Sequence, residues 1–199
     1  MIKIVLTGGP CGGKTVVQSA IKKEFGDLAI LVPEIATLLI NNGFPAPGKE
    51  FRWNKEWDLL FSDTILPLQL SFEKACLMTA KKNCRLMICD RGVLDVAAHF
   101  YGGTAAFCKW YGLSEKDLLL RYEAVVHLKS MAVIDPCSYG KSNNDARFGS
   151  LSYAKRVERM TRIVWAKHPN RIIIGGQEGI EGKISTTINF VRSMMSKAP

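Results

Sequence analysis

Short apolar runs and longer helix-like stretches alternate along this chain of 199 residues. The apolar runs have the length of β-strands, and five of them stand out: residues 2–6, 28–32, 86–89, 124–128 and 172–174. Segments of helical length separate these runs. Strands that alternate with helices in this way predict an α/β fold, in which a parallel sheet has helices on both faces.

The first apolar run leads directly into a glycine-rich loop. Residues 8–15 read GGPCGGKT, a complete G-x-x-x-x-G-K-[ST] pattern, and a helix-like segment follows. Such a loop turns consecutive backbone N–H groups inward, and a helix that begins at Lys14 adds the positive end of its dipole. The pattern predicts a triphosphate-binding loop made of Gly8, Gly9, Pro10, Cys11, Gly12, Gly13, Lys14, Thr15 and Val16.

Two side chains at the end of this loop have separate expected roles. We expect the Lys14 ammonium to reach the β- and γ-phosphates, and the Thr15 hydroxyl to ligate Mg²⁺. The ligands are then Mg²⁺ and either ATP or GTP. A glycine-rich turn that matches the pattern by chance is the alternative, but the strand before it and the helix after it favour the phosphate loop.

Glu34 stands just after the second apolar run. In a parallel sheet, ligands bind beyond the carboxyl ends of the strands, so this carboxylate faces the ligand side. There it would accept a proton from an acceptor hydroxyl or hold a sugar hydroxyl. The alternative is a glutamate in the first turn of the short helix that follows, where it interacts with the helix dipole.

Asp90 and Arg91 close the third apolar run. A carboxylate at this place holds Mg²⁺ in many P-loop enzymes, so we expect Asp90 and Thr15 to share the metal. The Arg91 guanidinium offers a fixed fork of donors to a phosphate or to the acceptor. The alternative is an aspartate helix cap beside a surface arginine.

A polar, turn-rich segment follows the fourth apolar run and continues into a basic helical pattern. It predicts a lid at about residues 135–165 that closes Arg147 and Arg156 over the phosphates and excludes water. A solvated basic face is the alternative interpretation. After the last apolar run, Gln177 stands in a loop that we expect near the base of the nucleotide.

Four further positions give expectations. Pro67 should kink or restart the helical pattern of the longest connection. Gln69 and Glu73, four residues apart, share a helix face that either lines an acceptor pocket or is exposed. His127, in the fourth apolar run, is expected to be a packed strand residue rather than a ligand.

The composition of the chain limits the classes of binding partner that we expect. The formal net charge of +9 favours anionic partners, namely nucleotides, phospholipid headgroups or nucleic acid. Nucleic acid ranks third, because no helix-turn-helix, zinc or RNA-binding signature is present. No apolar run has the length of a membrane span, and the first residues predict a core strand rather than a signal peptide. We therefore expect one cytoplasmic, non-transmembrane domain over residues 1–199.

The motifs together resemble a known family. The stretches IKIVLTGGPCGGKT, VPEIATLLI, ICDRGVLDVAAHF, YEAVVHL, NNDAR and VWAKHPNRIII span nearly the whole chain and are similar to those of the NadR-like, Ttd-type AAA nucleotide-binding domain family. The resemblance implies a three-layer P-loop NTPase fold with a five-stranded parallel sheet and a helical lid, like nucleoside and nucleotide kinases. It also implies that Asp90 and Arg91 form the D-R-G motif and that Arg147 is the lid arginine.

Two functions remain open at this stage. The first is a kinase that transfers the γ-phosphoryl group of ATP or GTP to a nucleoside-like acceptor, as a ribosylnicotinamide kinase does. Its candidate catalytic residues are Lys14, Glu34, Asp90, Arg91 and Arg147. The second is a GTP-binding regulatory or trafficking protein that binds anionic phospholipid (phosphoinositide) or a protein without turnover. The resemblance implies this alternative, because the family includes eukaryotic GTP-binding proteins linked to channel trafficking, and the net charge also favours it.

Overall fold

The computed structural model describes residues 1–48, 51–139, 150–176 and 179–197. Among these residues, five strands form one parallel sheet in the order β2-β3-β1-β4-β5. The strands are β1 (Ile2–Thr7), β2 (Ala29–Val32), β3 (Leu86–Asp90), β4 (Ala124–Leu128) and β5 (Arg171–Ile174). Each overlaps one of the five apolar runs, so the predicted parallel sheet is confirmed.

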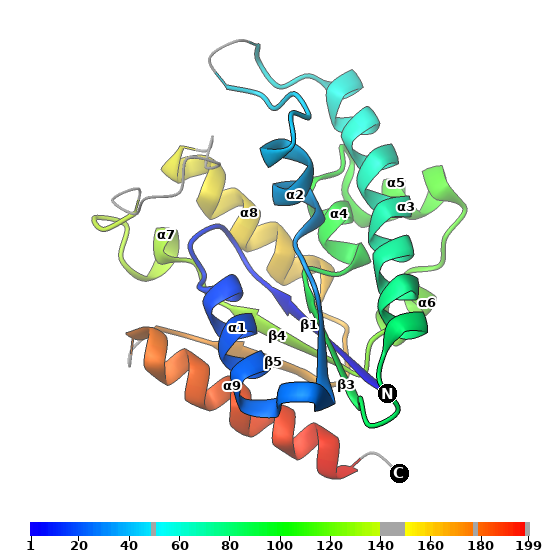
Figure 1. Cartoon of the computed structure of the whole chain (residues 1–199). Coiled ribbons are helices and arrows are strands. Elements are labelled where there is room, and N and C mark those ends of the chain that lie inside the picture. Colours follow the sequence, from blue (N-terminus) through cyan, green and yellow to red (C-terminus); the bar gives the residue numbers. More distant parts are fainter. Residues whose placement is uncertain (49–50, 140–149, 177–178, 198–199) are drawn as a thin grey trace.

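Helices cover both faces of the sheet, which gives three layers (Figure 1). One face is covered by α1 (Lys14–Phe25) and α9 (Gly179–Lys197), which pack side by side. The other face and the carboxyl edge carry the remaining helices: α2 (Ile35–Asn41), α3 (Lys55–Thr79), α4 (Val93–His99), α5 (Gly103–Tyr111), α6 (Glu115–Leu120), α7 (Met131–Ile134) and α8 (Leu151–Val164). A short 3-10 turn, η1 (Gly26–Leu28), precedes β2. In the described part of the chain, no helix combines the length and the apolar character that crossing a membrane requires.

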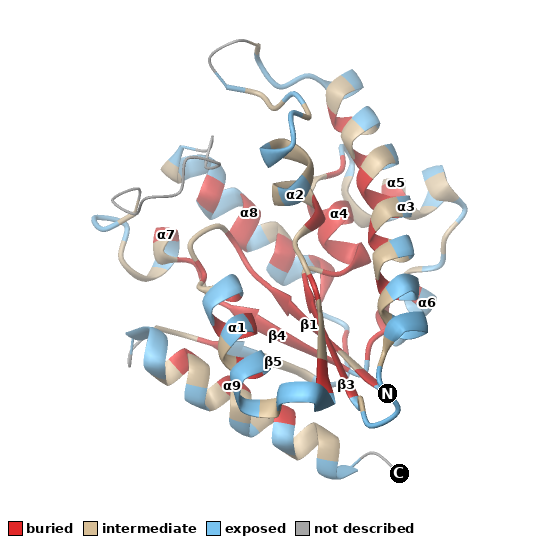
Figure 2. Cartoon of the chain, viewed as in Figure 1, coloured by how far each residue is buried: buried red, intermediate tan, exposed pale blue. Residues whose placement is uncertain are grey.

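The central strand β1 contributes to two separate hydrophobic cores. Ile4 and Leu6 belong to the core under α1 and α9, whereas Val5 belongs to the core under α3, α4 and α8. Figure 2 shows β1, β3 and β4 as a buried layer between the helices, whereas the edge strands β2 and β5 are partly exposed. Because both faces of the sheet are covered, the strands are mostly apolar rather than alternating.

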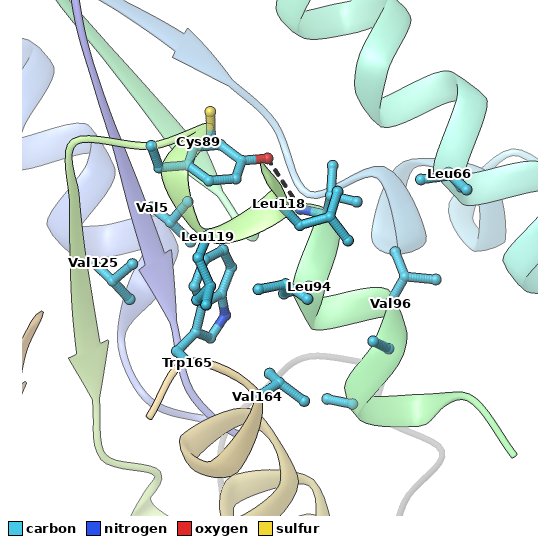
Figure 3. Close-up of a cluster of buried hydrophobic side chains, with 14 of the residues drawn as sticks. Val5, Leu66, Cys89, Leu94, Val96, Leu118, Leu119, Val125, Val164 and Trp165 are labelled. Atoms are coloured by element: carbon cyan, nitrogen blue, oxygen red, sulfur yellow. Dashed lines mark hydrogen bonds between the residues drawn. The ribbon is translucent and has the colours of Figure 1, made fainter. Parts of the chain in front are cut away.

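Trp165, just after α8, is the largest fully buried side chain. Figure 3 shows it among Val5, Val125 and Leu94, where it fills the space between the sheet and α4. Its indole N–H donates to Asp95 Oδ2 at 3.1 Å. This contact fixes the start of α4, which is the helix that follows the D-R-G sequence.

The expected restart at Pro67 is wrong, because α3 continues from Lys55 to Thr79 through the proline. Proline removes one backbone N–H donor and crowds the preceding turn, which disfavours a helix interior. Here Ile65 and Leu66, which stand just before Pro67, are buried in the core, and this packing keeps α3 in one piece.

Gln69 and Glu73 are not exposed, so the exposed-face interpretation is wrong. Gln69 Nε2 also donates to the Arg91 carbonyl at 3.3 Å, and the acceptor-pocket interpretation stays a prediction. Both are buried, and the Glu73 carboxylate accepts hydrogen bonds from Gln69 Nε2 at 3.1 Å, the Tyr122 hydroxyl at 2.7 Å and Arg121 Nε at 2.9 Å. The pair therefore joins α3 to the segment that leads into β4. His127 is fully buried in β4, as expected for a packed strand residue.

Candidate nucleotide-binding site

The glycine-rich loop connects β1 to α1 at the carboxyl edge of the sheet. Gly8 and Gly13 have φ angles of +124° and +87°, in the range that favours glycine. A Cβ at Gly8 would also collide with the carbonyl oxygen of Leu128, so β4 lies directly against the loop. These glycines allow the tight turn that a phosphate cradle requires, and α1 begins at Lys14 as expected.

Lys14 folds back over the loop. Its side chain is buried, and Nζ donates to the Gly9 carbonyl at 3.1 Å, with the Gly8 carbonyl at 3.4 Å. Burial, together with the nearby Arg91 charge, lowers the pKa of Lys14 below its ordinary value. A triphosphate would supply the negative charge that this buried ammonium lacks.

Thr15 and Asp90 lie together beside Lys14. The Thr15 hydroxyl donates to Asp90 Oδ2 at 3.1 Å, whereas Asp90 Oδ1 is buried without a hydrogen-bond partner among the described residues. Burial raises the pKa of Asp90 to about 6, against the pull of the Lys14 charge. An unpartnered carboxylate oxygen next to a hydroxyl is a donor set that suits Mg²⁺, so the residues present fit the expected ion.

Glu34 and Arg91 form a half-buried ion pair at the adjacent strand ends. Arg91 Nε donates to Glu34 Oε1, and the Thr37 hydroxyl donates to the other carboxylate oxygen at 2.6 Å. Burial alone would raise the pKa of Glu34, but the charges of Arg91 and Lys14 outweigh it and lower the pKa to about 2. Glu34 is therefore an anion at neutral pH.

Arg91 joins this pair to the phosphate loop. Its φ of +77° lies in the left-handed region, which a residue with a side chain adopts at a cost of about 1–3 kcal/mol. From there its guanidinium also reaches the Gly8 carbonyl at 3.3 Å and Asp95 Oδ1 at 3.5 Å. The interpretation of Asp90 and Arg91 as a helix cap and a surface arginine is wrong, since both lie inside the site.

Sequence reasoning missed Asp95, whose carboxylate forms an ion pair with the Arg91 guanidinium. Its carboxylate accepts hydrogen bonds from the Thr7 hydroxyl, the Gly92 N–H at 2.9 Å and Trp165 Nε1. The available signal was an acidic residue in the first turn of the helix after Gly92, four residues beyond Arg91.

His99 at the end of α4 was also missed. Its Nδ1 lies 3.4 Å from the Tyr153 hydroxyl of α8, and burial, with Arg91 next, lowers its pKa to about 4. A neutral imidazole therefore borders the Glu34–Arg91 pair. No sequence motif indicated it, because α4 and α8 meet only in the fold.

The structure thus brings together Lys14, Thr15, Glu34, Asp90 and Arg91. Val16 lies in the first turn of α1 with its side chain half exposed. Arg156 is an exposed residue of α8, and its charge acts on His99 and on Asp58 of α3. Arg147 and Gln177, and with them the expected centre of the lid, lie outside the described residues.

Comparisons with known proteins identify the fold. The chain is similar in structure to a deoxyadenosine kinase from M. mycoides with bound dATP, with a TM-score of 0.55, 13% identity and coverage of 96% of this chain and 100% of that one. It is also similar to a thymidylate kinase from Candida albicans, with a TM-score of 0.65, 13% identity and coverage of 96% and 91%. At that identity the likeness concerns the fold, which is the α/β P-loop kinase fold.

No curated protein matches the sequence. A family model described as an AAA domain, however, matches residues 3–183, from β1 into α9. That match includes the whole phosphate loop and all five described strands. By this match, the chain belongs to the AAA domain family of P-loop proteins.

Proposed function

We propose that this chain is a phosphotransferase that uses Mg²⁺ and ATP or GTP to phosphorylate a hydroxyl group of a nucleoside-like acceptor. The observation that carries the proposal is the ionised Glu34, which Arg91 holds beside Lys14, Thr15 and Asp90. A protein that only bound nucleotide would need the phosphate loop and the metal-side carboxylate, but not a second, ion-paired carboxylate at the neighbouring strand end.

The charge of Glu34 favours a neutral acceptor group. A carboxylate repels a phosphate monoester, but it accepts a hydrogen bond from a hydroxyl. The two structural neighbours are named for a nucleoside and for a nucleotide acceptor. Glu34 supports the nucleoside alternative, and the NadR-like sequence motifs make ribosylnicotinamide one candidate among the nucleosides.

Each residue of the site has its own role in the proposed transfer. Glu34 orients the acceptor hydroxyl and takes its proton as the oxygen bonds to the γ-phosphorus and the bond to the β–γ bridging oxygen breaks. A weak base suffices, because phosphoryl transfer proceeds through a loose transition state that requires little nucleophile activation. Lys14 compensates charge on the phosphates, and Arg91 keeps Glu34 ionised and in place.

Mg²⁺, held by Thr15 and Asp90, would neutralise phosphate charge when it is bound. The Asp90 carboxyl must lose its proton to ligate the ion. This requirement fits its position beside Lys14, whose charge favours the anion.

The test is an acceptor screen. The purified chain is incubated with Mg²⁺ and ATP or GTP and with a panel of nucleosides that includes ribosylnicotinamide, and diphosphate production is followed. We expect production that depends on the acceptor. The matched control is the same nucleoside without its 5′-hydroxyl, which should give no turnover.

Nucleotide binding without acceptor-dependent turnover would contradict the proposal. It would favour the alternative of a GTP-binding regulatory protein, for which the net charge of +9 is the observation. Binding to vesicles that contain phosphoinositide, compared with neutral vesicles, would then be the next measurement.

A further inference from the structure

A buried carboxylate lies behind the phosphate loop and belongs to none of the roles above. Glu158 of α8 is 5% exposed, and its Oε2 accepts hydrogen bonds from the Gly9 N–H at 2.8 Å and the Ser130 N–H at 3.2 Å. Its Oε1 lies 2.7 Å from Nε2 of the buried His127. All of its polar contacts are therefore directed at the outer side of the loop and at β4.

The contact with Gly9 fixes one particular peptide plane. The Gly8–Gly9 peptide presents its N–H to Glu158 on the outer side. Its carbonyl, that of Gly8, lies 3.4 Å from Lys14 Nζ and 3.3 Å from Arg91 on the inner side. A peptide between two glycines rotates easily, since neither residue has a Cβ that restricts it. Rotation here would remove the outer bond and both inner contacts together.

Neighbouring residues hold the rest of the loop from the same side. Three contacts follow in sequence: the Ser130 hydroxyl to the Pro10 carbonyl, the Met131 N–H to the Cys11 carbonyl at 3.3 Å, and Lys183 Nζ to the Gly12 carbonyl at 2.9 Å. Close packing accompanies them, because a Cβ at Gly9 would lie 3.1 Å from Glu158 Cβ. Contacts from the segment after β4, from α7 and from α9 thus hold the backbone of the loop in place.

The negative charge of Glu158 distinguishes an electrostatic role in nucleotide binding from a geometric one. Burial alone would raise the pKa of this carboxyl, but the His127 contact and the two backbone N–H groups outweigh burial and lower the pKa. Glu158 is then an anion directly behind a loop that binds a polyanion. By charge alone it weakens nucleotide binding, so its contribution must come from the geometry that it imposes.

We propose that Glu158 is a positioning residue of the nucleotide site, which locks the Gly8–Gly9 peptide so that its carbonyl holds Lys14 and Arg91 in place. The inference rests on nucleotide binding by the phosphate loop and is independent of any acceptor. It also links α8, the helix that carries Arg156, to the loop.

The test compares Mg²⁺–ATP affinity by calorimetry in wild type, Glu158→Ala and Glu158→Gln. We expect Glu158→Ala to weaken binding about tenfold, because two buried N–H groups lose their acceptor and the peptide is freed. Glu158→Gln should stay within about threefold of wild type, since its carbonyl oxygen still accepts both bonds. If Glu158 acted through charge alone, both variants would bind ATP more tightly, and this result would overturn the proposal.

A control variant and a second measurement separate positioning from folding. Thr161→Val changes a buried residue one turn further along α8, whose hydroxyl bonds only to carbonyls of its own helix. It should leave ATP affinity unchanged. If Glu158→Ala does not fold, Glu158→Met removes the acceptor without leaving a cavity and should show the same tenfold loss.

Hydrogen exchange of the Gly9 amide tests the contact without any ligand. We expect this amide to be protected in the wild type and to exchange at least about tenfold faster in Glu158→Met. Unprotected exchange in the wild type would overturn the inference. A wild type that binds no nucleotide would contradict both the proposed function and this inference. A wild type that binds ATP and protects the Gly9 amide but shows no acceptor-dependent turnover would contradict the proposed function alone.

Discussion

The phosphate side of this site and the side that we propose for the acceptor, called the acceptor side below, are built in different ways. The phosphate side is one continuous stretch, residues 8–15, in which backbone groups form the cradle. The acceptor side is made of single side chains from separate segments: Glu34 after β2, Arg91 after β3 and His99 at the end of α4. A backbone cradle tolerates changes in most of its side chains, whereas the acceptor side depends on each one. The acceptor can therefore change in evolution while nucleotide binding persists.

The largest effect is expected on the phosphate side, at the buried Lys14. Lys14→Ala removes the ammonium that we expect to reach the β- and γ-phosphates, so Mg²⁺–ATP affinity should fall by about a thousandfold or more, along with all turnover. Calorimetric titration measures this change. Lys23→Ala, an exposed lysine on the same helix, is the control. Full affinity in Lys14→Ala would refute the assignment of the phosphate loop.

The second effect separates the two sides of the site. Glu34→Gln keeps the shape of the side chain but removes the charge that orients and deprotonates the hydroxyl, so we expect acceptor-dependent kcat to fall about a hundredfold. Nucleotide affinity should stay nearly unchanged, because Asp95 still pairs with Arg91. Steady-state kinetics with the best acceptor from the screen provide the measurement. An equal loss of kcat and of nucleotide affinity would contradict the division into two sides.

This contrast also explains how much the sequence could predict. The strands and the phosphate loop were predictable, because apolar runs and a continuous motif encode them locally. Glu34, Asp90 and Arg91 were predictable as a group, because parallel strands place their carboxyl ends at one edge. Their pairing was not, since it depends on the backbone conformation at Arg91 and on Asp95 behind it.

Helix packing accounts for what the sequence did not indicate. Glu158 lies in a basic stretch of the sequence, which predicts a solvent-exposed side chain. In the structure it lies next to Val157 on the buried face of α8. A buried glutamate on that face was the available signal, but its partner Gly9 lies 149 residues away. Contacts of this range depend on how α8 packs against β4 and the loop, and no local pattern specifies that.

The third prediction concerns the carboxylate between the two sides. Asp90→Asn replaces a Mg²⁺ ligand by a weaker neutral one, so we expect the Mg²⁺ concentration for half-maximal turnover to rise about tenfold, with a smaller change in nucleotide binding. Magnesium titrations of turnover and of binding test this. Thr64→Val, which removes a hydroxyl bonded only within α3, is the control. Unchanged magnesium dependence would remove Asp90 from the metal site.

The smallest effect concerns the stability that the Glu34–Arg91 pair gives the fold. The pKa of Glu34 is about 2 in the folded protein, below the ordinary 4.5, so the unfolded state binds more protons between these values. The pair's contribution is therefore fully present above about pH 4.5 and is lost as the pH falls towards 2. After allowance for solvent screening of this partly exposed pair, we expect it to amount to about 1–2 kcal/mol.

Comparison with Glu34→Gln isolates this contribution from the other carboxyl groups. The difference in unfolding free energy between wild type and variant, from urea titrations at several pH values, should shrink as the pH falls from about 4.5. Asp90 works in the opposite sense, because its raised pKa of about 6 makes the folded state less stable as the pH rises through 4 to 6. The Glu34 charge contributes to that raised pKa, so Glu34 and Glu34→Gln are compared in an Asp90→Asn background, in which Asp90 does not titrate. A difference that stays constant with pH would mean that Arg91 does not lower the pKa of Glu34. Glu34 with its ordinary pKa of 4.5 would still be an anion at neutral pH, so the proposed role of Arg91 would be lost while the charge of Glu34 would remain.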